Sequence, residues 1–272
     1  MNDSQLKKVA LERRLDVLEM VYASKSGHIG GSMSCMDILA SLYYGVMDVE
    51  KIKACAPDRD RFILSKGHCA EALYAVLADK GFFAKQELTG FGAFDTPLAG
   101  HPTPKVPGVE AATGALGHGL SMGVGMSIGL KETDAHVYVL MGDGELAEGS
   151  IWEAAMAAAK YKLNSLTAII DRNRLQISGE TEAVMPLGDI AAKFASFGWE
   201  SRNCNGHMPS EIISKVTMNR PSDKPLVLIA DTIKGYGGTI MENNIKWHHG
   251  VPDAKQYEEI KSELQQRRDE IA

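Results

Sequence analysis

Two polar side chains, Asp143 and Asn173, each follow a short apolar run and stand thirty positions apart. Asp143 lies between two glycines, which allow the backbone to turn sharply. Ligands of open α/β sheets bind beyond the carboxyl ends of the strands, so we expect both side chains to face one crevice. A carboxylate, an amide and turn carbonyls are hard oxygen ligands that suit Mg²⁺, which usually also coordinates a substrate phosphate. The pattern predicts a magnesium site for a diphosphate ligand.

The residues around this pair predict the elements that position it. Val137–Met141 and Leu166–Ile170 are typical of buried strands, and the alanine-rich stretch Ser150–Lys162 predicts a helix between them. Because strands and helices alternate, we expect one α/β domain over residues 1–272, with a mostly parallel sheet and helices on both faces. Further strands are predicted at Arg61–Leu64, Trp199–Asn203 and Leu226–Ala230, and further helices at Ser4–Ser24, Ser34–Tyr44, Gly119–Leu130, Leu187–Phe197, Ser210–Met218 and Pro252–Ile271. The first of these helices is interpreted as a surface helix with one buried stripe.

Four histidines lie in segments that the predicted elements direct to the same sheet edge: His28, His68, His101 and His249. His28 stands in a predicted loop, Ser26–Gly31, and His101 in a long one, Phe94–Ala112; loops of that length are usually functional. Neutral imidazoles can hydrogen-bond hydroxyl groups and exchange protons near neutral pH. We therefore expect a second set of functional side chains beside the metal site.

The other histidines carry no firm assignment. No pair has the helical spacing of a zinc site, so zinc is not expected. His136 and His207 are interpreted as surface or strand-edge residues without a role, and His118 is not assigned. His248 is either a second contact beside His249 or a residue with no role.

Composition excludes several classes of protein. The 272 residues are 44% hydrophobic and 24% charged, which is ordinary for a globular chain. A net charge of −6 argues against a nucleic-acid partner, which calls for clustered Lys and Arg. No run approaches the about 20 apolar residues of a membrane span, and the charged amino terminus lacks a signal-type apolar region. The four cysteines have neither disulfide-framework nor metal spacing, which predicts free thiols and a cytoplasmic location.

The Gly142–Gly144 turn followed by Asn173 resembles the cofactor signature of thiamine diphosphate enzymes, and further motifs resemble those of transketolases. These motifs occur in the family's order and cover nearly the whole chain. They are Ser26–His28, Ser65–His68, Gly100–Pro102, Thr113–Gly119 and Trp247–Gly250. The resemblance implies a thiamine diphosphate-binding domain and transfer of a two-carbon ketol unit from a ketose to an aldose, with the cofactor as electron sink.

The resemblance also implies a role for each matched residue. Asp143, Asn173 and the carbonyl of Leu175 would bind Mg²⁺, for which Ca²⁺ or Mn²⁺ can substitute. His28 and His101 would bind sugar hydroxyls. Glu148 matches a carboxylate that faces the dimer interface and couples paired cofactor sites, although an acid at a helix N-terminus is also favoured by the helix dipole alone. The cofactor would contact His68, Gly114, Gly144, Asn173 and His249, which also lies near the substrate, and Leu116 and Ile177 would pack against its rings.

A complete transketolase also has a pyrimidine-binding domain and a carboxyl-terminal domain, so we expect this chain to be the amino-terminal subunit of a split transketolase. It would need a companion pyrimidine-binding subunit, most simply in an α₂β₂ assembly. Glycines spaced four apart in Gly119–Leu130 would permit close helix contact, and the family places this helix at the dimer contact. The donor and acceptor sugars stay open, with phosphorylated and sulfonated sugars both compatible.

Two other interpretations of the sequence are kept. The chain could be a subunit of another thiamine diphosphate enzyme, similar to deoxyxylulose phosphate synthase or to a 2-oxo acid dehydrogenase, although the histidines argue against the dehydrogenases. It could also be a non-catalytic binding protein on the same fold. Cofactor titration separates the last interpretation from both enzymes.

Overall fold

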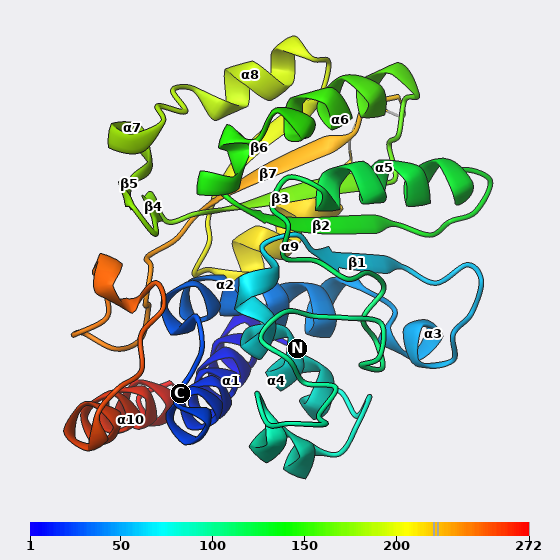
Figure 1. Cartoon of the computed structure of the whole chain (residues 1–272). Coiled ribbons are helices and arrows are strands. Elements are labelled where there is room, and N and C mark those ends of the chain that lie inside the picture. The colour runs from blue at the N-terminus through cyan, green and yellow to red at the C-terminus, as the bar shows by residue number, and fades with distance from the viewer. Residues whose placement is uncertain (220, 222, 272) are drawn as a thin grey trace.

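The computed structural model describes residues 1–219, 221 and 223–271. Its centre is a five-stranded sheet in the order β1-β2-β3-β7-β6, in which every neighbouring pair is parallel (Figure 1). The predicted parallel sheet is therefore confirmed. The strands are β1 (Arg61–Leu64), β2 (Val137–Gly142), β3 (Leu166–Arg172), β6 (Glu200–Asn205) and β7 (Leu226–Asp231). A short antiparallel pair that the sequence did not predict, β4 (Leu175–Gln176) and β5 (Gly179–Glu180), follows β3.

Helices cover both faces of the sheet, as predicted (Figure 1). Val137, Val139 and Met141 of β2 point into one apolar cluster, whereas Tyr138 and Leu140 point into the other. This alternation follows from the two-residue period of a strand. The first cluster is covered by α5 (Gly119–Gly129), α6 (Gly149–Lys160) and α8 (Ile190–Ser196), and the second by α1 (Asp3–Ser24), α2 (Ile29–Ser41), α4 (Ala70–Asp79) and α9 (Pro209–Thr217).

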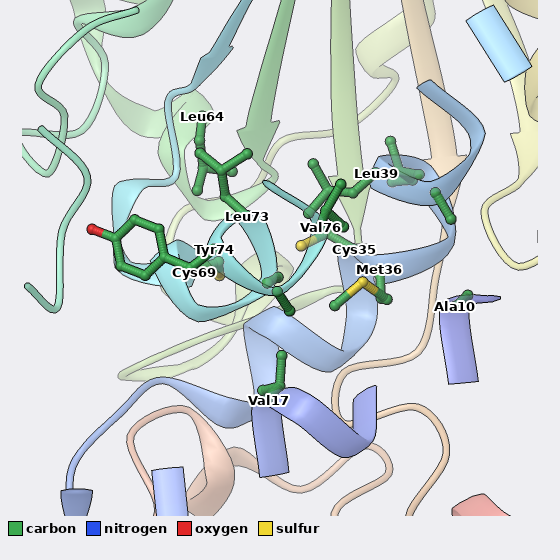
Figure 2. Packing of buried hydrophobic residues seen from close by; sticks show 14 of the residues in the cluster. Ala10, Val17, Cys35, Met36, Leu39, Leu64, Cys69, Leu73, Tyr74 and Val76 are labelled. Carbon is green, nitrogen blue, oxygen red and sulfur yellow. The ribbon is translucent and has the colours of Figure 1, made fainter. Parts of the chain in front are cut away.

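The helix predicted at the amino terminus is more deeply buried than a surface helix. It packs against α2, α4 and α10 (Ala254–Asp269), and side chains of this core are shown in Figure 2. Arg14 is fully buried, and its guanidinium bonds both Asp37 (2.6 Å) and the carbonyl of Met33 (2.8 Å). The predicted single buried stripe is present but wider than its apolar positions indicated, because Arg13 and the paired Arg14 are enclosed with it.

The second helix begins earlier than predicted. It starts at Ile29 with His28 at its N-cap, so Ser26–Gly31 is not a loop throughout. The Ser34 hydroxyl does not cap a helix; it bonds the carbonyl of Gly31 and the buried Asp171 instead. A Cβ added to Gly30 would stand 2.5 Å from the Trp247 carbonyl oxygen, so glycine is needed for this helix to approach the Trp247 segment closely.

The remaining elements are short. The helix α2 continues as a π-helical turn (Leu42–Val46), which the prediction had included in an α-helix. Residues 94–112 form no helix or strand, as predicted. The other elements are α3 (Val49–Lys53), α7 (Thr181–Val184) and 3₁₀ turns at Gly67–Cys69, Lys85–Gly90, Gly144–Ala147 and Ile245–Trp247. Among the described residues, no helix is long and apolar enough to cross a membrane.

Candidate functional site

Asp143 and Asn173 lie at the carboxyl ends of neighbouring parallel strands. Asp143 follows β2 and Asn173 follows β3, and Gly142 is in register with Asp171. The two strand ends are in direct contact, because the backbone N–H of Arg174 donates to the Asp143 carboxylate at 2.5 Å. The structure thus brings together the oxygen ligands that the sequence placed at one edge.

The Asn173 amide is held in one orientation. Its Nδ2 donates to Asp171 (3.2 Å) and to the hydroxyl of Ser34 (3.3 Å), so its Oδ1 faces the following turn and accepts from the N–H of Leu175 (3.1 Å). The carbonyl of Leu175 accepts a hydrogen bond from the Lys234 ammonium at 3.1 Å. The Leu175 carbonyl therefore already accepts from a cationic side chain, and its place in a metal site stays a prediction.

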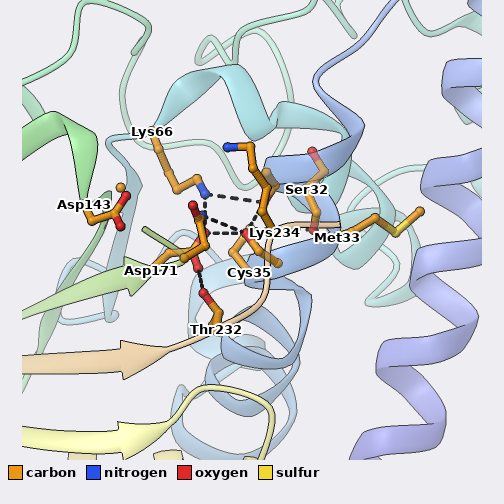
Figure 3. A network of polar contacts seen from close by, with 12 residues as sticks. Ser32, Met33, Cys35, Lys66, Asp143, Asp171, Thr232 and Lys234 are labelled. Atoms are coloured by element: carbon orange, nitrogen blue, oxygen red, sulfur yellow. Dashed lines mark hydrogen bonds and ion pairs between the residues drawn. The ribbon is translucent and has the colours of Figure 1, made fainter. Parts of the chain in front are cut away.

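A buried ionic network underlies this edge of the sheet (Figure 3). The Asp171 carboxylate forms an ion pair with Lys66, which follows β1, and accepts hydrogen bonds from Ser34 and from Thr232, which follows β7. Burial alone would raise the pKa of Asp171, but Lys66 and the hydrogen bonds hold it below the ordinary value. The network joins the ends of three strands and fixes Asn173.

Sequence reasoning did not assign Asp171, Lys66 or Thr232 to the site. A usable signal was present, because each is a polar residue directly after a predicted strand or one residue beyond it. The structure shows that all three are buried. Their burial could not be deduced until the strand order was known.

The charges of the site fit a metal ion with a diphosphate. Burial, and next the neighbouring Asp171, raise the pKa of Asp143, so a cation would stabilise its ionised form. Burial and the nearby Lys66 lower the pKa of Lys234, whose ammonium an anion would stabilise. No group of three His, Cys, Asp or Glu side chains among the described residues could hold a metal ion. A site built from one carboxylate, one amide and one carbonyl suits Mg²⁺ better than zinc.

The four predicted histidines come together around His28. Its ring centroid lies 4.6 Å from that of His249, 5.3 Å from His68 and 6.0 Å from His101. His248 joins them, 5.8 Å from His28 and stacked on His68 at 5.3 Å. The five rings, defined here as the histidine cluster, come from segments far apart in the sequence.

Three members of the histidine cluster favour the neutral imidazole. Burial, and next His68, lower the pKa of His28 to about 4. The same causes lower the pKa of His101. Burial, and next Lys234, lower the pKa of His248 to about 3. Near neutral pH these rings are hydrogen-bonding groups without charge, which suits recognition of hydroxyl groups.

Glu71 of α4 fixes the backbone of His28. Its Oε1 accepts from the His28 N–H at 2.8 Å, and its Oε2 accepts from the Ser32 hydroxyl at 2.9 Å. The side chain is fully buried, and burial, with Cys69 as the next cause, raises the pKa of Glu71 to about 7. A carboxylate between two histidine segments had not been singled out from the sequence.

Replacing Glu71 with Gln should remove a pH-dependent loss of stability. The folded-state pKa is raised from 4.5 to about 7, so Glu71 favours folding below pH 4.5, and this contribution is lost as pH rises through 7. From about pH 5 to about pH 8, Glu71→Gln should gain roughly 2–3 kcal/mol relative to wild type. Urea unfolding at both pH values measures the difference. The control Glu50→Gln, at an exposed side chain, should show no such change; an equal effect of Glu71→Gln at both pH values would contradict the assignment.

Glu145 braces the turn that carries Asp143. Its buried carboxylate accepts from the Ser65 hydroxyl and from the backbone N–H groups of Gly117 (2.9 Å) and Gly142 (3.2 Å). This joins the Thr113–Gly119 motif to the end of β2. Glu145 was not singled out from the sequence. Glu148, which was expected at a dimer interface, is exposed at the N-cap of α6 and makes no capping hydrogen bond, and its interface role stays a prediction.

The other predicted cofactor contacts surround this edge. Gly114 has a φ of +139°, and a Cβ there would stand 2.8 Å from the His101 ring, so glycine lets the chain pass this histidine. A Cβ on Gly144 would stand 2.9 Å from Gln176. Leu116 is partly exposed and Ile177 is 69% exposed. Their packing against a cofactor stays a prediction.

The interpretation of His207 as a surface or strand-edge residue was wrong. Its Nδ1 lies 2.8 Å from Asp37, its Nε2 accepts from the N–H of Ile233, and its ring stacks on Tyr236 at 3.7 Å. The residue links α2 to the segment after β7, which supports the site. Sequence alone could not show this, because Asp37 lies 170 positions away.

Comparison with known proteins agrees with this geometry. A family model described as the transketolase, thiamine diphosphate binding domain, matches residues 5–269. This chain belongs to the transketolase family. The resemblance inferred from the motifs is confirmed, and with it the thiamine diphosphate-binding domain.

Relatives of the chain fall into two groups by length. One of the subunits of apulose-4-phosphate transketolase from Phocaeicola vulgatus is 50% identical over 259 residues, covering 94% of this chain and 92% of the relative. The 6-deoxy-6-sulfo-D-fructose transketolase subunit SqwG of a Clostridium species is 39% identical over 227 residues, covering 82% of each. Human transketolase is 37% identical over 275 residues, which are 98% of this chain but 44% of the human protein. The resemblance to transketolase subunits is thus confirmed.

The fold also agrees with solved transketolases. The crystal structure of transketolase from Campylobacter jejuni superposes with a TM-score of 0.88 at 28% sequence identity. The alignment covers 97% of this chain and 43% of the bacterial chain. The transketolase-like sequences favour this family over the synthase-like and dehydrogenase-like alternatives.

Proposed function

We propose that this chain is the diphosphate-binding subunit of a split transketolase, which transfers a two-carbon ketol unit from an anionic ketose to an aldose. The observation that carries the proposal is the meeting, at one sheet edge, of the oxygen ligands at Asp143 and Asn173 with the histidine cluster. The first group suits a metal diphosphate and the second a polyhydroxylated substrate. The two relatives named as subunits and matched over most of their length support a divided enzyme.

Three oxygens of this chain would hold the metal ion: the Asp143 carboxylate, Asn173 Oδ1 and the Leu175 carbonyl. We propose Mg²⁺, with Ca²⁺ or Mn²⁺ as substitutes, because the donor set is hard and contains one charge. Lys66 and Lys234 offset the negative charge of the diphosphate. Thiamine diphosphate, when bound, supplies the reactive carbon and the electron sink for ketol transfer.

The remaining contacts belong to the cofactor and the sugar. His68 and His249, with main-chain groups of Gly114 and Gly144, would contact the cofactor, and the exposed Ile177 would be covered by its rings together with Leu116. His28 and His101 would bind hydroxyls of the sugar and move a proton at these oxygens. Their lowered pKa values keep the imidazoles neutral, so at pH 7 each can accept a hydrogen bond from a hydroxyl or donate one to it.

The companion subunit is proposed to cover one end of this site. The exposed Glu148 at the N-cap of α6 and the small residues of the neighbouring α5 offer a surface for close contact between subunits. Ile128 on α5 and Met156 on α6 are large exposed side chains there. An α₂β₂ assembly in the cytoplasm is the simplest symmetric arrangement.

The substrate is proposed to be a sugar with a remote anionic group. One relative is named for a sugar phosphate and another for a sulfonated sugar, so both anions occur among similar subunits. The resembled family places most of its phosphate-binding arginines in the domain that a companion would supply. This chain would then bind the hydroxyl groups of the sugar, and the companion subunit would bind its anionic end.

The proposed function is tested with the chain mixed with a carboxyl-terminal transketolase-like subunit. Ketose formation from a ketose donor and an aldose should depend on both thiamine diphosphate and Mg²⁺. Omitting either should reduce the rate to background, and Ca²⁺ or Mn²⁺ should restore part of it. Ketol transfer that is unaffected by removal of the cofactor would refute the proposal.

His101→Ala should leave cofactor affinity nearly intact and lower kcat/KM for ketose donors by about tenfold. The assigned contact of His101 is to substrate hydroxyls, and its loss leaves a polar partner unpaired. Steady-state kinetics on the assembled enzyme measure the change. The control His136→Ala, at an exposed histidine near the amino end of β2, should retain wild-type rates. Wild-type kcat/KM of His101→Ala on every donor would remove His101 from the site.

A further inference from the structure

We propose that His248 is an additional substrate-binding residue whose imidazole hydrogen-bonds a hydroxyl of the ketose chain. The inference rests on the proposed function and deepens it, because it concerns which part of the substrate this subunit recognises. It arises from one unpaired atom and from the surroundings of that atom.

His248 Nδ1 is the one buried side-chain nitrogen or oxygen that lacks a hydrogen-bond partner within residues 1–219, 221 and 223–271. Buried polar groups are almost always paired, and leaving one unpaired costs about 1–3 kcal/mol. An orphaned atom beside a binding site indicates a partner that arrives with the ligand. The residue as a whole is partly exposed, so a ligand beside the histidine cluster can reach it.

Hydrogen bonds hold the backbone around His248, whereas the ring nitrogen Nδ1 has no hydrogen bond. The N–H of His248 donates to the carbonyl of Ile245 at 2.9 Å, and Asn244 caps the preceding 3₁₀ turn through the N–H of Lys246. Gly30 of α2 packs against the carbonyl of Trp247. The segment therefore holds the Cα of His248 in place and leaves Nδ1 available for a hydrogen bond to a ligand.

The neighbours of the His248 ring indicate which kind of ligand it would bind. It stacks on His68 and meets His28 edge-on, so it lies between a residue assigned to the cofactor and one assigned to the sugar. Burial and the adjacent Lys234 disfavour its cation, which makes it a poor partner for a phosphate. The Lys234 ammonium is the positively charged group beside it. A hydroxyl, which can both donate and accept, matches either tautomer of a neutral imidazole.

The competing ligand is a metal ion, and the geometry does not support it. In the part of the chain that the structure describes, no three His, Cys, Asp or Glu side chains are placed to share a metal ion, although five imidazoles lie close together. The histidine cluster is thus arranged for several separate hydrogen bonds. A chain of hydroxyls is the ligand that requires such an arrangement.

The experiment compares three variants, His248→Ala, His248→Asn and His248→Gln, in the enzyme assembled with its companion. Each is assayed with hydroxypyruvate, which carries the two-carbon unit but no hydroxyl chain, and with the better donor of D-xylulose 5-phosphate and D-fructose 6-phosphate. Asn places an amide nitrogen near the position of Nδ1, and Gln places one near Nε2. The exposed His136→Ala is the control.

His248→Ala should lower kcat/KM for the ketose phosphate by about five- to tenfold, as expected for one lost neutral hydrogen bond. The kcat/KM for hydroxypyruvate should stay within about twofold of the wild-type value. His248→Asn should recover most of the loss, and His248→Gln should not. Thiamine diphosphate affinity, followed by calorimetry, should be unchanged in all three.

The other outcomes overturn the inference in distinguishable ways. Equal losses on both donors, or weaker cofactor binding, would mean that His248 supports the cofactor or the local structure. An unchanged ketose rate in His248→Ala, or use of hydroxypyruvate but neither ketose by the wild type, would remove the hydroxyl contact. A wild-type assembly that transfers from no donor would instead refute the proposed function, and this inference with it.

Discussion

Asp143→Ala is expected to abolish metal-dependent binding of thiamine diphosphate. Asp143 supplies the one carboxylate of the proposed ligand set, beside the Asn173 amide and the Leu175 carbonyl. Removing a residue that only supports a metal ligand typically costs about 10- to 100-fold in affinity, so losing the charged ligand itself should cost more. The carboxylate is buried, with Asp171 nearby.

Calorimetry with Mg²⁺ and thiamine diphosphate, in the presence of the companion subunit, measures this loss. Asp143 also accepts hydrogen bonds from the N–H groups of Arg174 and Gly144, so the Ala variant needs a control for folding. Asp143→Asn keeps one of the two acceptor oxygens and removes the charge, so it should bind the metal and cofactor far more weakly. Thermal unfolding of each variant checks that it is folded. Asp134→Ala, at an exposed acid on a segment before β2, should bind as wild type does. Wild-type affinity in Asp143→Ala would refute the metal site.

The purified chain alone should show no ketol transfer above background. The residues gathered at the sheet edge are assigned to the metal, the diphosphate and the sugar, whereas the resembled family provides the carboxylate that activates the cofactor's pyrimidine from another domain. General acid–base groups typically contribute about 10²- to 10⁴-fold, so the missing partner alone would reduce the rate by at least about 100-fold. A companion subunit should restore it.

Mixing this chain with a carboxyl-terminal transketolase-like subunit should produce both ketol-transfer activity and a complex of larger mass. Size-exclusion light scattering gives the mass, and a rate titration gives the ratio of chains at which activity saturates. An α₂β₂ particle with saturation at one to one is the expected result. A substitution such as Met156→Glu on the exposed part of α6 should weaken both signals if this surface meets another subunit. Robust turnover by the chain alone, free of contaminating partner, would refute the divided-enzyme proposal.

Much of the fold and part of the site followed from the sequence because they depend on local patterns. The apolar runs before Asp143 and Asn173 identified two strands, and the alanine-rich stretch identified α6, since strand and helix periods are set over a few residues. Parallel strands joined by a helix must present their carboxyl ends at one edge. The contact between the two strand ends was therefore predictable from the chain order alone.

The pairing of distant polar groups inside the molecule depends on the tertiary structure. Glu71 and His28 lie 43 positions apart, Lys66 and Asp171 lie 105 apart, and Asp37 and His207 lie 170 apart, so no local pattern connects them. Burial and pairing shift the pKa values of Glu71 and Asp171, and both depend on strand order and on the helices that cover each face. Local sequence patterns were sufficient to locate the strand ends and the polar side chains that follow them. The packing of the chain decided which of those side chains are buried, which are neutral, and that His248 Nδ1 is left without a partner.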